Sequence, residues 1–310
     1  MTVPTNAVVL GIGADGFDAA LAVAIAEARR TQRPLHLVHV LQLPPGDAYV
    51  GVYGGVLDAA KATLDGALAE ARTLAGSDVP VTGELMDTGW VVDDLVRRTD
   101  GASLLVMQHR ALSRVKRVFV GSMVHGVAGR AHVPVLSVPE GWDPTSSPKG
   151  VVTVAVQDPV EAPAILRSGF TEARDRGARL VVLHAWWLAS GFDVVVVDGS
   201  VRDEWAARSR EEMQPVLAPL QEEFPDVDVT IEVRHAPPVE AVLDAGEASD
   251  VLVLGRRHHR LPIGTHLGPV VRAALDHGSC PVLVTPELRS EVGRSETESR
   301  GALTGAAAHG

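Results

Sequence analysis

The segment LLVMQHRALSRVKRVFVGSMVHGVAGRAHVPVLSVP, Leu104–Pro139, returns later in the chain as VLVLGRRHHRLPIGTHLGPVVRAALDHGSCPVLVTP, Val251–Pro286. The two segments align without a gap, so Leu104 pairs with Val251 at a separation of 147 residues. Each opens on an apolar run of strand length, passes through a loop and an amphipathic helical pattern, and closes on a second apolar run. A self-similar period of this size predicts two copies of one domain fused in tandem.

Outward from this segment, buried-strand runs alternate with helical patterns in both copies, as expected for a parallel sheet with helices on both faces. Strands are predicted near Ala7–Ile12, Leu35–Leu41, Val79–Leu85, Leu104–Met107 and Val133–Val138, and again near Val151–Val156, Leu180–Trp186, Val227–Val233, Val251–Gly255 and Val282–Thr285. Helices are predicted over Ala19–Arg29, Val56–Leu74, Val91–Arg98, Met123–Ala131 and Val201–Glu223. Each copy is therefore predicted to be a doubly wound α/β domain with five parallel strands in a flavodoxin-like or related order. Any ligand is expected at the carboxyl ends of the strands, near the point where the strand order reverses.

Breaker residues mark the boundary between the copies, because EGWDPTSSPKG at 140–150 carries turn residues and no apolar periodicity. The predicted domains are residues 1–140 and 151–287, joined by a linker at 141–150. The small, polar stretch 288–310 is predicted to be disordered.

Composition narrows the class of protein. The chain has 310 residues, a formal net charge of −11 and a single cysteine, Cys280. The acidic balance disfavours binding to nucleic acid or to an anionic membrane, and the apolar runs are too short to cross a bilayer. One cysteine leaves no internal disulfide and fits a reducing compartment, so a cytoplasmic location is expected.

The loop after the fourth strand of each copy is the most informative stretch. The second copy reads Gly255-Arg256-Arg257-His258, nine residues, then Gly268-Pro269; the first reads Gln108-His109-Arg110-Ala111, nine residues, then Gly121-Ser122. Glycines let a backbone wrap closely around a phosphate, and a helix that begins at the end of such a loop adds N–H donors and a favourable dipole.

This spacing resembles the universal stress protein family, whose nucleotide-binding members carry Gly, two residues, Gly, nine residues and then Gly-Ser or Gly-Thr. The resemblance covers both copies, including LVHV at Leu37–Val40, LHA at Leu183–Ala185 and CPVLV at Cys280–Val284. It implies an adenine nucleotide alpha hydrolase-like fold and a site for ATP or a related adenine nucleotide across the ends of the first and fourth strands. It also implies that the fusion is a covalent version of the dimer that the family commonly forms.

Both copies depart from the family pattern. The aspartate that the family places after the first strand is Gly13 in one copy and Gln157 in the other. The candidate contacts at these strand ends are Gly11, Gly13, Val156 and Gln157. In the loops, Gln108 and Ala111 replace both early glycines of the first copy, whereas in the second His258 replaces one glycine and Pro269 replaces the serine. Pro269 suits a helix start but removes one N–H donor.

Basic side chains gather in the same loops and could hold an anion in place of the missing backbone donors. They are Arg110, Arg114, Lys116 and Arg117 in the first copy, and Arg256, Arg257, His258, His259 and Arg260 in the second. The alternative is an ordinary solvated basic loop, since exposure is the usual state of these residues.

Three other features have plainer interpretations. Gly11, Gly13 and Gly16 form a literal GxGxxG, but no acid ends the next strand and the second copy lacks the pattern, so a tight turn is favoured over a dinucleotide site. The histidines show no spacing typical of a metal site, and Cys280 is expected to be a small buried side chain. Trp186 and Trp187 either form a pocket wall or pack against the helix predicted at Val201–Glu223.

These observations support three hypotheses. The first is a stress-linked regulatory or protective factor that binds ATP or a related adenine nucleotide, more readily in the second copy, without being an enzyme; weak ATP turnover is left open. The second is a nucleotide-independent interaction module that binds a protein partner or forms a homodimer, and pairing of the final strands Val133–Val138 and Val282–Thr285 would make the chain a pseudo-dimer. The third, a dinucleotide-dependent enzyme, rests on the glycine motif and the fold class alone.

Overall fold

The computed structural model describes residues 3–13, 16–41, 53–87, 90–109, 120–145, 148–158, 163–188, 197–256 and 267–286. The first half comprises β1 (Val8–Ile12), α1 (Asp18–Thr31), β2 (Leu35–Val40), α2 (Tyr53–Ala75), β3 (Val81–Met86), α3 (Val91–Arg98), β4 (Leu104–His109), α4 (Val120–Arg130) and β5 (Val135–Pro139). The second comprises β6 (Val151–Ala155), α5 (Pro163–Arg176), β7 (Arg179–Trp186), α7 (Gly199–Glu223), β8 (Val229–His235), α8 (Pro238–Glu247), β9 (Val251–Gly255), α9 (Pro269–His277) and β10 (Val282–Thr285).

All ten strands form one sheet in the order β3-β2-β1-β4-β5-β10-β9-β6-β7-β8. Each half therefore has the order 3-2-1-4-5 within itself, and all its strand pairs are parallel. Of the related orders that the sequence left open, this is not the flavodoxin order 2-1-3-4-5. The predicted α/β fold, two copies of a parallel five-stranded sheet, is confirmed.

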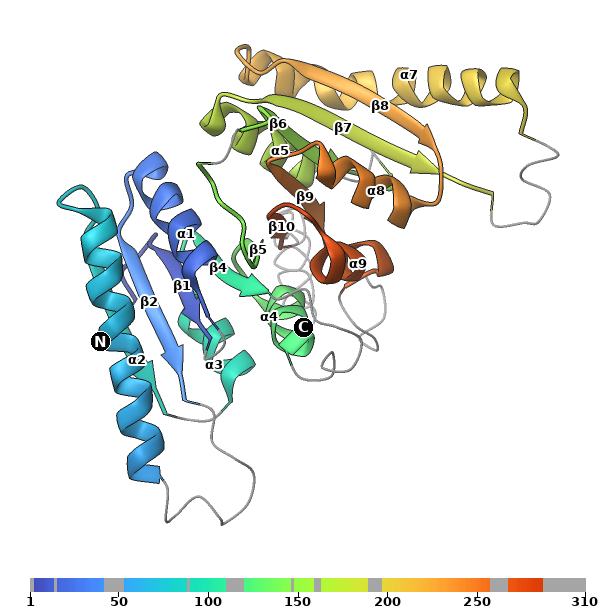
Figure 1. Cartoon of the computed structure of the whole chain (residues 1–310). Helices are drawn as coiled ribbons and strands as arrows, with labels where there is room; N and C mark the ends of the chain where they lie inside the picture. Colours follow the sequence, from blue (N-terminus) through green and yellow to red (C-terminus); the bar gives the residue numbers. More distant parts are fainter. Residues whose placement is uncertain are drawn as a thin grey trace, which may run out of the picture.

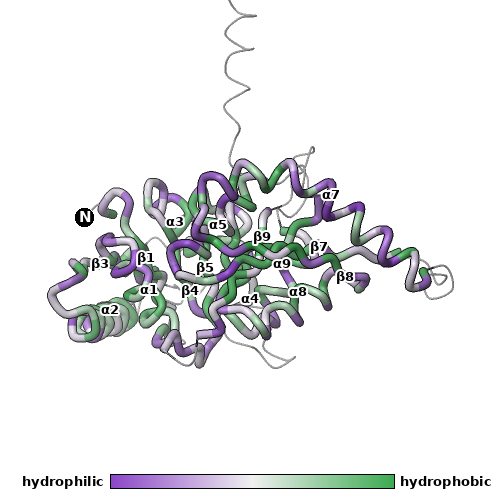
Figure 2. The backbone as a smooth tube through the Cα atoms, turned by 90° about the horizontal axis from the view of Figure 1, so that it is seen from above, coloured by the Kyte–Doolittle hydropathy of each residue, from purple (hydrophilic) through white to green (hydrophobic). Residues whose placement is uncertain are grey.

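The burial of the strands follows their place in the sheet. Inner strands are buried on both faces, as the continuous apolar runs of β1 and β2 require, while the two edge strands, β3 and β8, are only partly buried. Figure 2 shows the same arrangement, with the most hydrophobic parts of the backbone in the central strands.

Helices cover both faces of the sheet, and the same face of each half carries corresponding helices. One apolar cluster joins residues of α1, α2, α5 and α7 to the strands, and a second joins residues of α3, α4, α8 and α9. No helix in the described part of the chain is both long enough and apolar enough to cross a membrane.

The halves join through their last strands, which lie side by side in the middle of the molecule (Figure 1). β10 pairs antiparallel with β5, with Leu283 opposite Leu136 and Val282 opposite Ser137. The predicted pairing of the final strands within the chain is confirmed. It covers a strand edge that each half would otherwise expose to association with other chains.

A buried ionic cluster crosses the same junction and links α1 to α5. Glu27, only 3% exposed, pairs with Arg30 on its own helix and with Arg176 on the opposite one. The cluster is completed by Arg30 at 2.9 Å from Asp175 and Arg176 at 3.1 Å from Glu172. Burial raises the pKa of Glu172, an effect that Arg176 opposes. Arg174 pairs with Asp175 at 2.7 Å on the more exposed side, so the cluster holds three acids and three arginines around the buried Glu27.

Candidate functional site

The ends of β1 and β4, where a ligand is expected, lie side by side in the first half, and the ends of β6 and β9 do so in the second. β1 pairs with β4 in register, with Gly11 opposite Met107, and the strand order reverses at this pair. Gly11 is buried in β1, while Gly13 lies exposed just beyond it. In the second half, Val156 is buried and Gln157 is exposed at the corresponding point. The four predicted strand-end residues therefore lie at the two switch points.

The two candidate sites differ in the residue at the end of the fourth strand. In the first, the side chain of Gln108 accepts a hydrogen bond from the backbone N–H of Ala20 at 3.2 Å, in the first turn of α1. The N-terminus of a helix has backbone donors without intrahelical partners, and these are the donors that bind anions. Gln108 thus uses one of them internally.

The second crevice has no such side chain, because the residue 147 positions after Gln108 is Gly255. A Cβ atom at Gly255 would lie 3.1 Å from Cδ1 of Ile165 on α5, so a larger residue would have to move that side chain. Gly255 therefore carries no side chain that could bond to α5 as Gln108 bonds to α1, and Ile165 of α5 lies against it. From the sequence, Gln108 stands where the family pattern has a glycine. The hydrogen bond from Ala20 shows what this replacement does, because the glutamine side chain takes a backbone donor of α1.

The start of α9 provides the other part of the second crevice. Gly268 is the N-cap residue, with φ of −70° and ψ of 167°, and it has no side chain of its own to cap the helix. Any residue can adopt this extended conformation, so the backbone angles at this position do not require glycine. Pro269 occupies the first helical position. In the first half, α4 begins earlier than predicted, at Val120, so Gly121 and Ser122 fall in its first turn.

Among the basic residues predicted to hold phosphate, Arg256 is the one that the structure describes. Its Nη1 donates a hydrogen bond of 2.9 Å to the carbonyl of Gly129, near the end of α4 in the other half. Arg256 therefore links the loop of one domain to a helix of the other, a role that the sequence did not indicate. Arg110, Arg257 and His258 lie outside the described residues.

Two histidines, one in each half, bond to the backbone at the end of the first strand. His39 donates from Nδ1 to the carbonyl of Ile12 at 3.0 Å, and His184 makes the same bond to Val156 at 3.2 Å. Each histidine lies on the second strand of its half and holds the carboxyl end of the first strand in place. The sequence analysis missed this role, although the recurrence of the histidine in LVHV and LHA was a signal for it.

His109, at the end of β4, is 6% exposed, and its Nδ1 lies 2.8 Å from Oγ of Ser137. Burial lowers the pKa of His109 to about 4, with Asp276 opposing this shift and His125 adding to it.

We expect His109 to make the protein less stable in acid. Since its folded pKa lies below the ordinary value of about 6.5, the unfolded chain binds the extra proton first. The contribution of neutral His109 to the free energy of unfolding is thus fully present above pH 6.5. It is lost as the pH falls towards 4, by about 3 kcal/mol in total. Urea unfolding of the wild type and His109→Gln between pH 7.5 and 4.5 should give stability curves that converge on acidification. Parallel curves would contradict this assignment.

The remaining sequence features have structural roles. Gly16 has φ of 115°, which favours glycine, so the last residue of the GxGxxG pattern forms the turn before α1. Cys280 is fully buried, as predicted, and burial raises the pKa of its thiol to about 12. Trp186 packs on Trp205 of α7, with ring centroids 5.0 Å apart, as one of the two alternatives predicted. Within the described ranges, no three His, Cys, Asp or Glu side chains are placed to hold a metal ion.

Comparison with known proteins agrees with this geometry. The model of the universal stress protein family matches residues 5–139 and again 150–286. A universal stress protein of Mycobacterium tuberculosis (strain H37Rv) is 28% identical over 213 residues, which cover 68% of this chain and 67% of that one. Another from the same strain is 26% identical over 289 residues, covering 88% and 95%. Among solved structures, a universal stress protein from Archaeoglobus fulgidus shares the fold with a TM-score of 0.66 at 17% identity, covering 91% of this chain and 96% of that chain.

Proposed function

Since the chain belongs to the universal stress protein family, we propose that it is a tandem stress-response factor that binds ATP or a related adenine nucleotide in its second domain. The observation that carries the proposal is the contrast between Gln108, whose side chain takes a backbone N–H at the start of α1, and Gly255, which has no side chain to do the same in the second domain. The phosphates would lie at the start of α9, where the N-cap residue Gly268 has no side chain of its own to take the first backbone N–H groups. Arg256, Arg257 and the Gly268 turn would hold them, and the adenine would lie towards Val156 and Gln157. No catalysed reaction is part of the proposal.

A second candidate is a nucleotide-independent interaction module of the same family, acting through a protein partner or a homodimer. It is supported by Gly13 and Gln157, which stand where the family has its aspartate, and by Gln108, which occupies the first crevice. For either candidate we propose a cytoplasmic setting, consistent with the single buried cysteine.

Titration calorimetry of ATP distinguishes these candidates. We expect one ATP to bind per chain, and Gly255→Gln to weaken binding by about tenfold or more, because the new side chain would displace Ile165 and compete with the ligand at the end of β9. Gly66→Gln is the matched control: Gly66 is exposed on α2 with no atom near its missing Cβ, so ATP affinity should stay unchanged. The reverse variant, Gln108→Gly, should leave the second site intact.

Two results would reject nucleotide binding in the second domain. One is the absence of heat at millimolar ATP, with no nucleotide retained on purification; this would favour the interaction module. The other is unchanged affinity in both Gly255→Gln and the double variant Arg256→Ala/Arg257→Ala. The stability of the double variant has to be measured alongside, because losing Arg256 also breaks the bond to Gly129.

A further inference from the structure

The N-terminal half of α7 leaves a hollow beside the edge strand β8. The buried residues of this 25-residue helix begin at Ser209 and continue with Met213, Leu217 and Leu220 towards its C-terminus. Its first half contacts the sheet through Trp205, which stacks on Trp186 at the end of β7 with an interplanar angle of 20°. Between this half of the helix and β8 remains a hollow of about 420 Å³.

The walls of the hollow are aromatic and small. Trp186 and His235 contribute rings whose centroids are 4.3 Å apart, and Val233 and Ala206 complete the apolar lining. A volume of this size lies within the range of small-molecule sites. Polar side chains make up the larger part of the wall, and the hollow is partly open to solvent. The aromatic surface continues outward to Trp205, which is 47% exposed, and to Trp187, whose ring stacks on His235 with centroids 4.9 Å apart.

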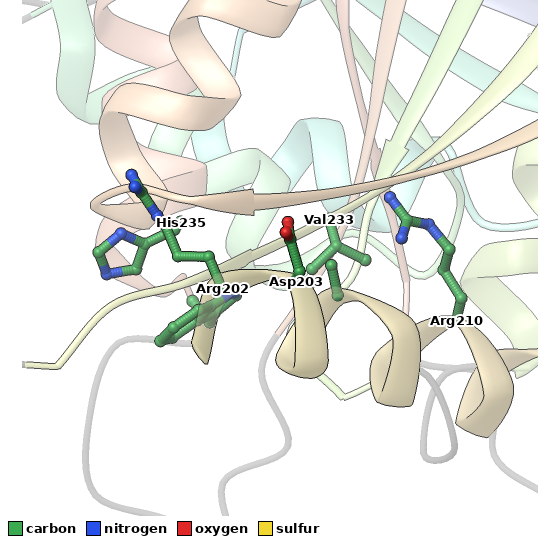
Figure 3. A pocket seen from close by; sticks show the side chains of 7 residues that line it. Arg202, Asp203, Arg210, Val233 and His235 are labelled. Carbon is green, nitrogen blue, oxygen red and sulfur yellow. The ribbon is translucent and has the colours of Figure 1, made fainter. Parts of the chain in front are cut away.

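The polar groups are mostly positive. Arg202, Ala206 and Arg210 are four residues apart along α7 and so line one face of the helix, with the two arginines about 12 Å apart along its axis. Figure 3 shows Arg202 beside His235 at one end of the hollow, Arg210 at the other and Asp203 between them. Within the described residues, neither arginine forms a side-chain ion pair, whereas Arg208, on another face of the helix, pairs with Glu212 at 2.9 Å.

We propose that this hollow binds a small planar aromatic anion, in the simplest case an aromatic carboxylate with an amino or hydroxyl substituent. The flat ring would pack edge-on against Trp186 and His235, whose faces contact Trp205 and Trp187. The anionic group would take a charge-assisted hydrogen bond from Arg202 or Arg210, and the substituent would donate to Asp203. The site lies beyond β7, along β8, and so is separate from the crevice between β6 and β9. It does not depend on nucleotide binding.

Anthranilate, a fluorescent aminobenzoate, is a suitable probe for the full-length protein. Its fluorescence anisotropy should rise saturably with protein concentration and less steeply at high salt, and Arg202→Gln and Arg210→Gln should each weaken binding by about tenfold if they contact the carboxylate. At least one of the two must show this loss. Ala206→Phe, which fills the hollow, should abolish binding. The controls are Arg208→Gln, which removes an equal charge outside the hollow, and anthranilamide, the neutral analogue, which should bind at least tenfold more weakly.

Several results would overturn this proposal. They are no saturable binding at millimolar anthranilate, equal affinity in the wild type and both hollow arginine variants, or equal affinity for anthranilamide. If ATP displaces anthranilate from the wild type but not from Arg202→Gln, the hollow is a nucleotide site instead. Binding of an acidic peptide in place of anthranilate would assign the surface to a protein partner. Retention of anthranilate binding in Gly255→Gln would support the separation of the two sites.

Discussion

Replacing Arg176 with methionine will lower the free energy of unfolding by about 3–5 kcal/mol at pH 7. Arg176 bridges Glu27 and Glu172, and its removal leaves these two acids with Arg30 as their shared cation, while Asp175 keeps Arg174 as well. Water cannot fully solvate the two carboxylates that lose Arg176, because Glu27 is 3% exposed and Glu172 is 17% exposed. Methionine keeps most of the buried volume, so the loss reports the charge rather than a cavity.

The pH dependence of this loss provides a second readout. Burial raises the folded pKa of Glu172 and Arg176 opposes this shift, so without Arg176 the folded pKa of Glu172 lies further above its unfolded value. The destabilising effect of the Glu172 charge is complete above that folded pKa and disappears as a proton binds. The penalty measured by urea unfolding should therefore be smaller at pH 5 than at pH 7.

Arg208→Met is the control, since Arg208 belongs to a pair that is 75% and 56% exposed and should change stability by less than about 0.5 kcal/mol. A loss below about 1 kcal/mol in Arg176→Met, or one that does not change with pH, would mean that the cluster behaves as a surface ion pair.

The second large effect is expected at the junction of the halves. Leu136 on β5 is 1% exposed and lies opposite Leu283 on β10, and both belong to one apolar cluster. Leu136→Asp would place a carboxylate in this core, at an expected cost of about 4 kcal/mol or more. Leu74→Asp is the matched control, because Leu74 is 50% exposed on α2 and should be nearly neutral.

Separately expressed halves, residues 1–144 and 148–310, should associate one to one, because each alone would expose the edge and apolar face of its last strand. Sedimentation equilibrium of the mixed halves measures this association, and Leu136→Asp in the first half should abolish it. Two well-behaved monomers that do not associate would show that the covalent linker, rather than the β5–β10 contact, joins the domains.

Much of the architecture was predictable because it depends on local patterns. Continuous apolar runs such as Val251–Gly255 predict strands buried on both faces, and the 147-residue repeat carries this prediction from one copy to the other. The repeat also predicts a candidate site in each copy and favours the second for a nucleotide, and these sites stay predictions. Nothing in the sequence indicated that Arg256, which is predicted to hold phosphate, donates a hydrogen bond to the carbonyl of Gly129.

The amino-acid sequence by itself determined the tandem repeat, the doubly wound domains and the switch points at which Gly13 and Gln157 lie, because helical and strand periodicity are properties of neighbouring residues. Only the tertiary structure decided which distant side chains meet. Glu27 and Arg176 are 149 residues apart and come together because β5 pairs antiparallel with β10, which places α1 and α5 on one face of the sheet. The contact of Gln108 with Ala20 and the hollow between α7 and β8 likewise arise from packing between elements, and no spacing along the chain encodes them.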